Sequence, residues 1–273
     1  MSLDWGAGLH APIGGRVDAS AYWHYVGRWS QLFVPSVLAA AEVSTGDRVL
    51  DVATGSGEAA LMARSAVGRL GLVVGADIST AMLHAACGRL PRLTFNAVAT
   101  DGERLPFRDG CFDAAICQLG LMFFPEPVRG LAEARRVLRP GGRAAVCVIS
   151  SADRAPMWGV LAEILSRHLP EHARILQSSF ALADGRRLGR MFDAAGLHDI
   201  RVRSETREGI IGSFEEYWAP IEAGTGQMPQ AYLALPESSR RAVRDEVRDG
   251  LSPYYVHGRL VMSVEMLIGV GRA

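Results

Sequence analysis

The chain contains no lysine, since all 29 of its basic residues are arginine. This absence excludes a tyrosine–lysine proton relay of the kind used by some nicotinamide-dependent oxidoreductases. The 29 acidic residues balance the arginines, so the formal net charge is zero. No block of like charge suggests a surface for nucleic acid or for an anionic membrane.

Cysteine is scarce as well: the four cysteines form no Cys-x-x-Cys pair, and we expect buried free thiols and no metal. No apolar run reaches the roughly 20 residues that span a bilayer. Charged residues such as Asp4 and Arg16 interrupt any signal peptide, so we expect a cytoplasmic protein away from the membrane. Nucleophile-elbow, His-Glu-x-x-His and P-loop motifs are absent.

The most informative stretch runs from Arg48 to Glu58: an apolar strand, a Gly-x-Gly turn and the start of a helix. Asp77 follows Gly57 by twenty positions, at the end of the next apolar run. This spacing indicates a nucleotide-type ligand bound across the first two strands of a doubly wound sheet. Gly55 and Gly57 would let the backbone approach the ligand, and Asp77 would accept hydrogen bonds from ribose hydroxyls.

Two carboxylates near the glycine turn indicate which nucleotide-type ligand the site prefers. Asp51 ends the first strand and Glu58 opens the helix, where both would repel a pyrophosphate. They suit a ligand with positive charge, such as the ammonium and sulfonium of S-adenosylmethionine (SAM). A further acid, Asp101, follows a third expected strand at 93–98 and could accept from an adenine amino group. The sequence therefore favours SAM over a pyridine dinucleotide.

Five segments then match a known family in order, together spanning most of 48–149: Val49–Gly57, Val74–Asp77, Thr100–Phe107, Phe112–Pro125 and Arg136–Val146. The chain resembles a class I SAM-dependent methyltransferase of the ubiquinone/menaquinone-methyltransferase-like (methyltransferase type 11) group. Gly27–Ser30 also matches small-molecule methyltransferases of this group. One departure is Ala53, where many members carry glycine; alanine fits unless the residue needs a positive φ.

Strands and helices alternate to about residue 150, which predicts parallel βαβ units in an α/β fold. The resemblance implies a doubly wound, Rossmann-like seven-stranded sheet whose last strand, expected at 258–271, is antiparallel. We expect an N-terminal helical segment at 1–41 that covers the active site, and a SAM-binding domain at 42–206 and 258–273. A helical cap at 207–257, inserted before the last strand, would lie over the substrate site.

Local patterns predict individual elements. Helices are expected at 18–27, 30–41, 58–67, 79–88, 126–138, 156–168, 184–195 and 237–250. The fifth and sixth strands are expected at 144–149 and 200–206.

The resemblance and the motifs together suggest a set of cofactor-binding residues: Arg28, Asp51, Ala53, Gly55, Ser56, Gly57, Asp77, Ile78, Met82, Thr100, Asp101, Gly102, Gln118 and Leu119. Arg28 could pair with the SAM carboxylate or be a solvated helix arginine. Ile78 or Met82 could cover the adenine face or belong to the core.

The candidate acceptor pocket combines apolar and aromatic residues: Tyr22, Trp23, Met122, Phe123, Tyr217 and Trp218. No catalytic residue is identified, because no histidine has a partner that would orient it as a base. His24 and Tyr22 are weak candidates.

We therefore expect methyl transfer from SAM to a small-molecule acceptor, with S-adenosylhomocysteine as the by-product. A flat, apolar bacterial secondary metabolite or its precursor would suit an aromatic-lined pocket. Two alternatives stay open: NAD-dependent oxidoreduction on a similar sheet, and a SAM-binding protein of this fold that catalyses a non-methylating reaction. The acceptor atom and the choice between monomer and homodimer are also open.

Overall fold

The computed structural model describes residues 19–89, 95–224 and 226–273. One sheet organises the chain, in the strand order β3-β2-β1-β4-β5-β8-β6. The five strands of its first part are parallel: β1 (Arg48–Val52), β2 (Leu72–Asp77), β3 (Asn96–Ala99), β4 (Phe112–Gln118) and β5 (Leu138–Ile149). The last strand, β8 (Arg259–Arg272), runs antiparallel to both of its neighbours, β5 and β6 (His198–Ile211).

This topology confirms the expected doubly wound sheet with an antiparallel last strand. The sheet has one strand more than expected, because the two-residue β7 (Tyr255–Val256) pairs with the start of β8.

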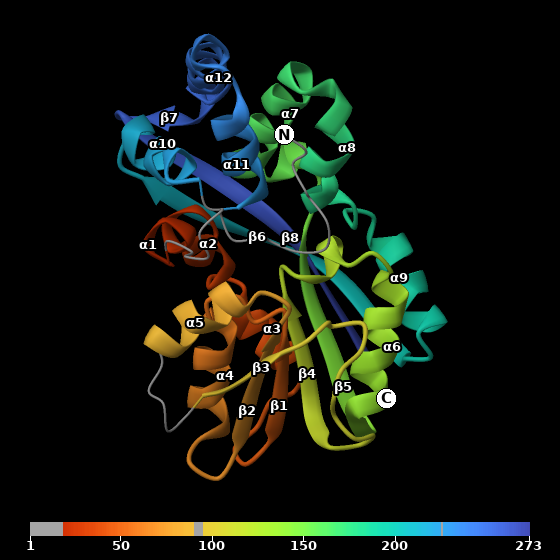
Figure 1. Ribbon diagram of the computed structural model, residues 1–273. Helices are drawn as coiled ribbons and strands as arrows, with labels where there is room; N and C mark the ends of the chain where they lie inside the picture. The colour runs from red at the N-terminus through yellow and green to blue at the C-terminus, as the bar shows by residue number, and fades with distance from the viewer. Residues whose placement is uncertain (1–18, 90–94, 225) are drawn as a thin grey trace.

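Helices cover the sheet on both sides (Figure 1). In the first group, α3 (Val34–Ala40) contacts α4 (Glu58–Val67), and α5 (Thr80–Arg89) packs near β2 and β3. In the second group, α6 (Pro127–Val137) contacts α9 (Gly185–Ala194), which packs on β6 and β8. Each crossover helix buries one apolar stripe against the sheet, as a parallel α/β fold requires.

A second cluster of helices surrounds the far ends of β6 and β8, which extend beyond the parallel strands (Figure 1). It contains α7 (Pro156–His168), α8 (Ala173–Leu176), α10 (Phe214–Glu222), α11 (Gln227–Ala234) and α12 (Glu237–Gly250). Between this cluster and the parallel strands lie α1 (Ala19–Tyr22), the π-helix η1 (Trp23–Gly27) and α2 (Arg28–Ser30). The carboxyl edge of the parallel strands therefore faces α1, η1, α2 and the second cluster of helices.

Several expected elements are confirmed to the residue, namely the helices at 58–67, 156–168 and 237–250. The two expected N-terminal helices are confirmed only in part. The first is divided into α1 and the π-helix η1 and continues into α2, and the second, α3, begins only at Val34, with Pro35 in its first turn. The sixth strand runs through Ile211, because its polar second half still pairs with β8. Residues 1–18 of the N-terminal segment, and positions 93 and 94 of the third expected strand, lie outside the described residues.

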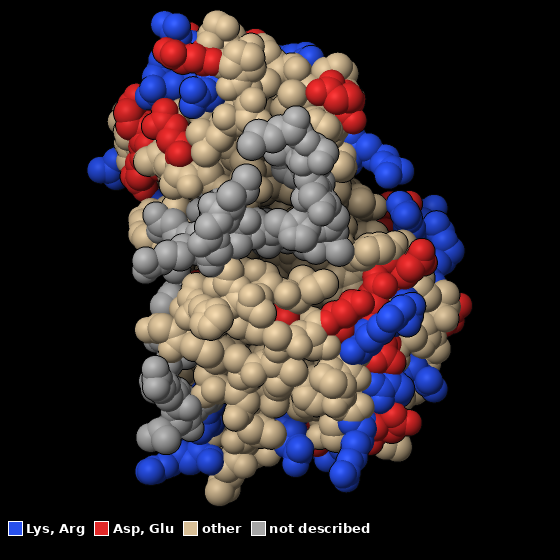
Figure 2. Space-filling view, in the orientation of Figure 1, with Lys and Arg blue, Asp and Glu red and all other residues tan. Residues whose placement is uncertain are grey.

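The surface and the thiols follow the composition. Figure 2 shows arginines interspersed with acidic residues, without a large region of one sign on that face. Arg244 and Arg248 of α12, for example, pair with Glu215 of α10. Cys117 and Cys147 are buried free thiols, whereas Cys87 is exposed and Cys111 is half-buried. Within the described ranges, no helix has the length and apolarity to cross a membrane.

Candidate functional site

A cleft opens at the carboxyl ends of β1 to β4, the edge where ligands bind in open α/β sheets. It encloses about 840 Å³ of space, including its open mouth. The described residues that line it come from four successive strand ends and from α1: Tyr22, Ala53, Gly55, Ala76, Asp77, Ile78, Met82, Thr100, Asp101, Gly102, Glu103, Gln118, Leu119, Gly120, Phe123, Phe124 and Pro125.

Asp77, at the end of β2, accepts hydrogen bonds from the backbone of two turns. Its Oδ2 accepts a 2.8 Å hydrogen bond from the amide of Gly55, and its Oδ1 accepts one of 2.8 Å from the amide of Ser79. Gly55 has a φ of +55°, which a residue without a Cβ adopts at little cost. Burial raises the pKa of Asp77, and the backbone hydrogen bonds oppose that shift. Each carboxylate oxygen keeps a further acceptor position for a ligand hydroxyl.

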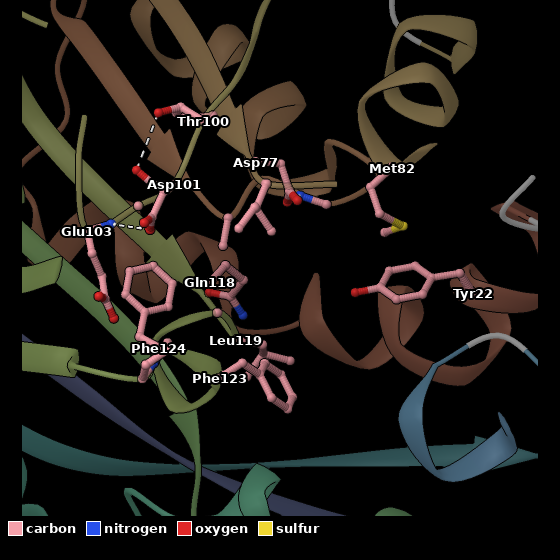
Figure 3. A pocket seen from close by; sticks show the side chains of 17 residues that line it. Tyr22, Asp77, Met82, Thr100, Asp101, Glu103, Gln118, Leu119, Phe123 and Phe124 are labelled. Atoms are coloured by element: carbon pink, nitrogen blue, oxygen red, sulfur yellow. Dashed lines mark hydrogen bonds between the residues drawn. The ribbon is translucent and has the colours of Figure 1, made fainter. Parts of the chain in front are cut away.

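The opposite wall of the cleft is formed by Asp101, Glu103 and Phe124 (Figure 3). The amide of Glu103 donates to Asp101 Oδ1 at 2.8 Å, and Glu103 itself accepts from the amide of Glu126 at 2.6 Å. A Cβ on Gly102 would lie 2.4 Å from Cζ of Phe124, so this glycine makes room for the aromatic ring. The wall therefore offers a carboxylate beside a flat apolar surface.

Asp51 of β1 is fully buried and is not among the described residues that line the cleft, so its cofactor-binding role stays a prediction. Thr54 Oγ1 donates to its Oδ2 at 2.7 Å, while its Oδ1 is a buried atom with no hydrogen-bond partner among the described residues. Burial raises the pKa of Asp51 to about 7, the bond from Thr54 lowers it, and the nearby charge of Asp77 raises it. Together the two acids favour a cationic ligand.

Gln118 joins the cleft to the N-terminal helices. Its Nε2 donates to the carbonyl of Ser30 at 3.1 Å, and its Oε1 is buried without a partner in the described part of the chain. Gln118 Oε1 is therefore a buried acceptor without a donor among the described residues, in a residue that lines the cleft. An ammonium is a ligand group that supplies such donors, so the residues present fit SAM.

Two cleft residues other than glycine adopt a left-handed backbone, Ala53 and Leu119, each with a φ of 56°. Alanine replaces glycine at position 53 without cost only if φ is negative. The positive φ of Ala53 therefore means that the substitution is not free of cost. Backbone strain of this kind is concentrated at functional sites.

Tyr22 points its hydroxyl from α1 toward the middle of the cleft (Figure 3). Burial raises its pKa, and the nearby charges of Glu58 and Asp77 raise it further. Tyr22 is therefore a hydrogen-bond donor and a poor base. His24 and Trp23 are not among the described residues that line the cleft; the ring of His24 has its Nδ1 2.8 Å from the carbonyl of Ser20.

A second, mostly apolar cavity adjoins the cleft and shares Tyr22, Leu119 and Phe123 with it. Its described lining comes from six parts of the chain: Tyr22, Tyr25, Val26, Leu119, Met122, Phe123, Ile149, Trp158, Ser179, Gly226, Gln227 and Met228. It encloses about 500 Å³ including open space. A molecule held here would meet a ligand of the cleft at the shared residues.

The remaining candidates lie elsewhere. Arg28 makes a 2.7 Å ion pair with Glu216 of α10 and lines neither cavity. Ser56 donates to Glu58, Gly57 precedes α4 with a φ of 86°, and neither lines the cleft. Their cofactor-binding roles stay predictions.

Tyr217 and Trp218 are buried within α10 and also line neither cavity, so their place in the acceptor pocket stays a prediction too. Tyr217 donates to the carbonyl of Met157 at 2.9 Å.

Sequence reasoning missed Ala76, Glu103, Gly120, Phe124 and Pro125 in the cleft. Phe124 and Pro125 belong to the matched segment Phe112–Pro125, so the motif itself held that information. Most of the second cavity was also missed, because its lining joins segments far apart in the sequence.

The comparisons with known proteins agree with this geometry. A family model described as a methyltransferase domain matches residues 50–146. A demethylmenaquinone methyltransferase of Mycolicibacterium gilvum (strain PYR-GCK) is 36% identical over 184 residues, which cover 63% of this chain and 77% of the relative. The chain belongs to the class I SAM-dependent methyltransferases of the menaquinone and ubiquinone type. Its cofactor is SAM.

Solved structures support the fold of this methyltransferase. A phosphoethanolamine N-methyltransferase of Haemonchus contortus, in complex with phosphomonomethylethanolamine and S-adenosylhomocysteine, superposes with a TM-score of 0.59 at 18% identity. The match covers 93% of this chain and 56% of the other. The [4+2]-cyclase SpnF superposes with a TM-score of 0.53 at 19% identity, covering 88% and 80%. At these identities the likeness concerns the fold alone.

Proposed function

We propose that this methyltransferase methylates a small, flat, largely apolar acceptor held in the second cavity, a bacterial secondary metabolite or its precursor. The observation that carries the proposal is the junction of the two cavities at Tyr22, Leu119 and Phe123. Methyl transfer needs the donor methyl and the acceptor atom in line and within contact distance. A cleft lined by strand-end acids and joined to a mostly apolar cavity supports that arrangement.

Within the cleft, the proposed roles follow from the hydrogen-bonding groups. Asp77 accepts from the ribose hydroxyls and Asp101 from the adenine amino group. Gln118 Oε1 accepts from the ammonium end of the cofactor, and Asp51, which lines neither cavity, reaches it through water. Charge-assisted bonds of this kind contribute about 1.5–3 kcal/mol each.

SAM supplies a methyl group already activated by the sulfonium. Bound SAM would pass its methyl group to an electron pair of the acceptor and leave neutral S-adenosylhomocysteine, and a hydroxyl acceptor would release its proton to solvent. The protein supplies alignment, which can lower the barrier by about 7–11 kcal/mol. Tyr22, protonated at neutral pH, orients the acceptor at the junction and does not remove its proton.

Two alternative functions would give different products. The 36% identical relative is named a demethylmenaquinone methyltransferase, which makes a quinone-type molecule a second candidate acceptor. The cyclase of similar fold illustrates that this fold also hosts other chemistry.

The test incubates the protein with SAM and a panel of hydroxylated aromatic compounds that includes a 1,4-naphthoquinol without a ring methyl. We expect S-adenosylhomocysteine in equal amount to a product heavier by one methylene unit, and neither with Asp77→Ala. Intact SAM with every acceptor, despite its firm binding, would contradict methyl transfer to this class. Uptake of a pyridine dinucleotide instead of SAM would favour the oxidoreductase alternative.

A further inference from the structure

Tyr25 carries a buried hydroxyl that no described residue satisfies. The side chain is only 4% exposed and lines the second cavity. Its hydroxyl oxygen is among the buried polar atoms that lack a hydrogen-bond partner within the described ranges. Leaving such a group unpaired in an apolar environment is costly, and each case in a native structure calls for an explanation.

The backbone around Tyr25 is unusual and held in place. Tyr25 lies in the π-helix η1, a rare conformation that occurs frequently at functional sites. The indole nitrogen of Trp158, another lining residue, donates to the carbonyl of Tyr25 at 3.2 Å. Tyr22 and Val26, on either side along the chain, line the same cavity. The bond from Trp158 thus holds the π-helix against α7 at Tyr25, between two further lining residues.

The surroundings of the hydroxyl are mostly apolar, because Val26, Met122, Ile149 and Met228 form much of the cavity. Burial raises the pKa of Tyr25, and the nearby Tyr217 raises it further, so the phenol keeps its proton and is available as a donor. A lining residue that carries a donor without an acceptor among the described residues is suited to a ligand that brings an oxygen.

We propose that the Tyr25 hydroxyl hydrogen-bonds a hydroxyl or carbonyl oxygen of the methyl acceptor, and so selects oxygen-bearing acceptors over hydrocarbons of the same shape. The inference rests on the proposed function of the second cavity as the acceptor site. Tyr25 is a specificity-determining residue in this role and takes no part in bond making. A site built around a buried polar group rejects an analogue that leaves that group unpaired, more strongly than it rejects a change in apolar size.

The test compares two molecules of similar shape, 2-naphthol and 2-methylnaphthalene, titrated into the full-length protein saturated with S-adenosylhomocysteine. Isothermal titration calorimetry reports binding. We expect the unaltered protein to bind 2-naphthol more tightly. Tyr25→Phe should weaken 2-naphthol binding by roughly 5- to 10-fold and leave 2-methylnaphthalene within about 2-fold.

Tyr232→Phe is the matched control, because Tyr232 is 5% exposed and lines neither cavity. It should change the ratio of the two affinities by less than about 2-fold, and all variants should bind S-adenosylhomocysteine alike. Equal loss of both probes in Tyr25→Phe, an unchanged preference, or no binding of either probe to the unaltered protein would overturn the inference. Because no methyl is transferred in this experiment, its failure is distinct from a failure of the proposed activity.

Discussion

The amide of Gly55 donates a 2.8 Å hydrogen bond to Oδ2 of Asp77, across 22 positions of sequence. The bond joins the turn after β1 to the tip of β2, because the parallel register pairs Val52 with Ala76 immediately before these residues. The spacing between a glycine turn and a later acid thus corresponds to one contact at the sheet edge. It also means that Asp77 shapes the turn as well as presenting acceptors.

Replacing Asp77 tests this dual role. Asp77→Asn removes the negative charge that would accept from the ribose hydroxyls, and charge-assisted bonds contribute about 1.5–3 kcal/mol. The dissociation constant for SAM should rise about 10- to 100-fold by calorimetry. Asp184→Asn is the control: Asp184 also accepts from two backbone amides, at the start of α9, but does not line the cleft. An unchanged SAM affinity in Asp77→Asn would contradict the assignment.

The pKa of Asp51 predicts a pH dependence of stability. Burial raises its folded pKa from 3.8 to about 7, so the folded protein holds a proton that the unfolded chain has lost between these values. The associated stability is fully present below about pH 4 and is lost as the pH rises to about 7. Each pH unit in this window costs about 1.4 kcal/mol.

Asp51→Asn keeps an acceptor for Thr54 but cannot ionise. Between pH 5.5 and pH 8, the unaltered protein should lose about 2 kcal/mol of unfolding free energy relative to this variant. Urea titrations of both proteins without cofactor measure the difference. If the two proteins respond identically to pH, Asp51 does not titrate in this range.

Arg136 of α6 binds the loop between β3 and β4, which continues from the cleft wall at Asp101 and Glu103. It binds both carboxylate oxygens of Glu133 and Oδ1 of Asp109, and donates to the carbonyls of Leu105 and Phe107. Lysine cannot reproduce this planar fork. Arg136→Lys should therefore lower the unfolding free energy by about 1–3 kcal/mol and weaken SAM binding through the adjoining wall.

The control for that variant is Arg167→Lys, in an exposed pair with Glu163 and Glu246. Exposed pairs contribute little, so the unfolding free energy should change by less than about 1 kcal/mol. Equal effects of the two substitutions in urea unfolding would show that the fork at Arg136 has no special role.

Replacing Ala53 with glycine should stabilise the protein. Relief of its left-handed backbone should outweigh the extra chain entropy of glycine, so Ala53→Gly should raise the unfolding free energy by roughly 0.5–1 kcal/mol. Ala66→Gly, the same substitution inside α4, should lose about 1 kcal/mol. Thermal or urea unfolding compares the two; a loss at both positions would mean that Ala53 carries no strain.

The sequence predicted most of the SAM-binding part of the fold because its features are local. Strand, glycine turn and helix follow one another from Arg48 to Val67, and strand-end acids mark the edge of a parallel sheet. The π-helix at Trp23–Gly27 was not predicted, because it differs from an α-helix in hydrogen-bond register and not in residue pattern. The second half of β6 was not predicted either, since its charged, exposed side chains resemble a loop.

The site residues, too, could be predicted only where they belong to local motifs. Cleft residues such as Gly55, Asp77 and Asp101 sit at strand ends that the motifs locate. The second cavity instead brings Tyr25 together with Trp158 and Met228, from three elements whose packing no local pattern encodes. Tyr217 and Trp218 were expected at the acceptor pocket from their aromatic character, which serves equally well for packing in the core.

A structure with S-adenosylhomocysteine bound would show whether the cleft holds the cofactor. We expect the adenosine between Asp77 and Asp101, and the sulfur beside Leu119 and Phe123, facing the second cavity. A ligand bound outside the cleft, or a sulfur turned away from the second cavity, would contradict this expectation.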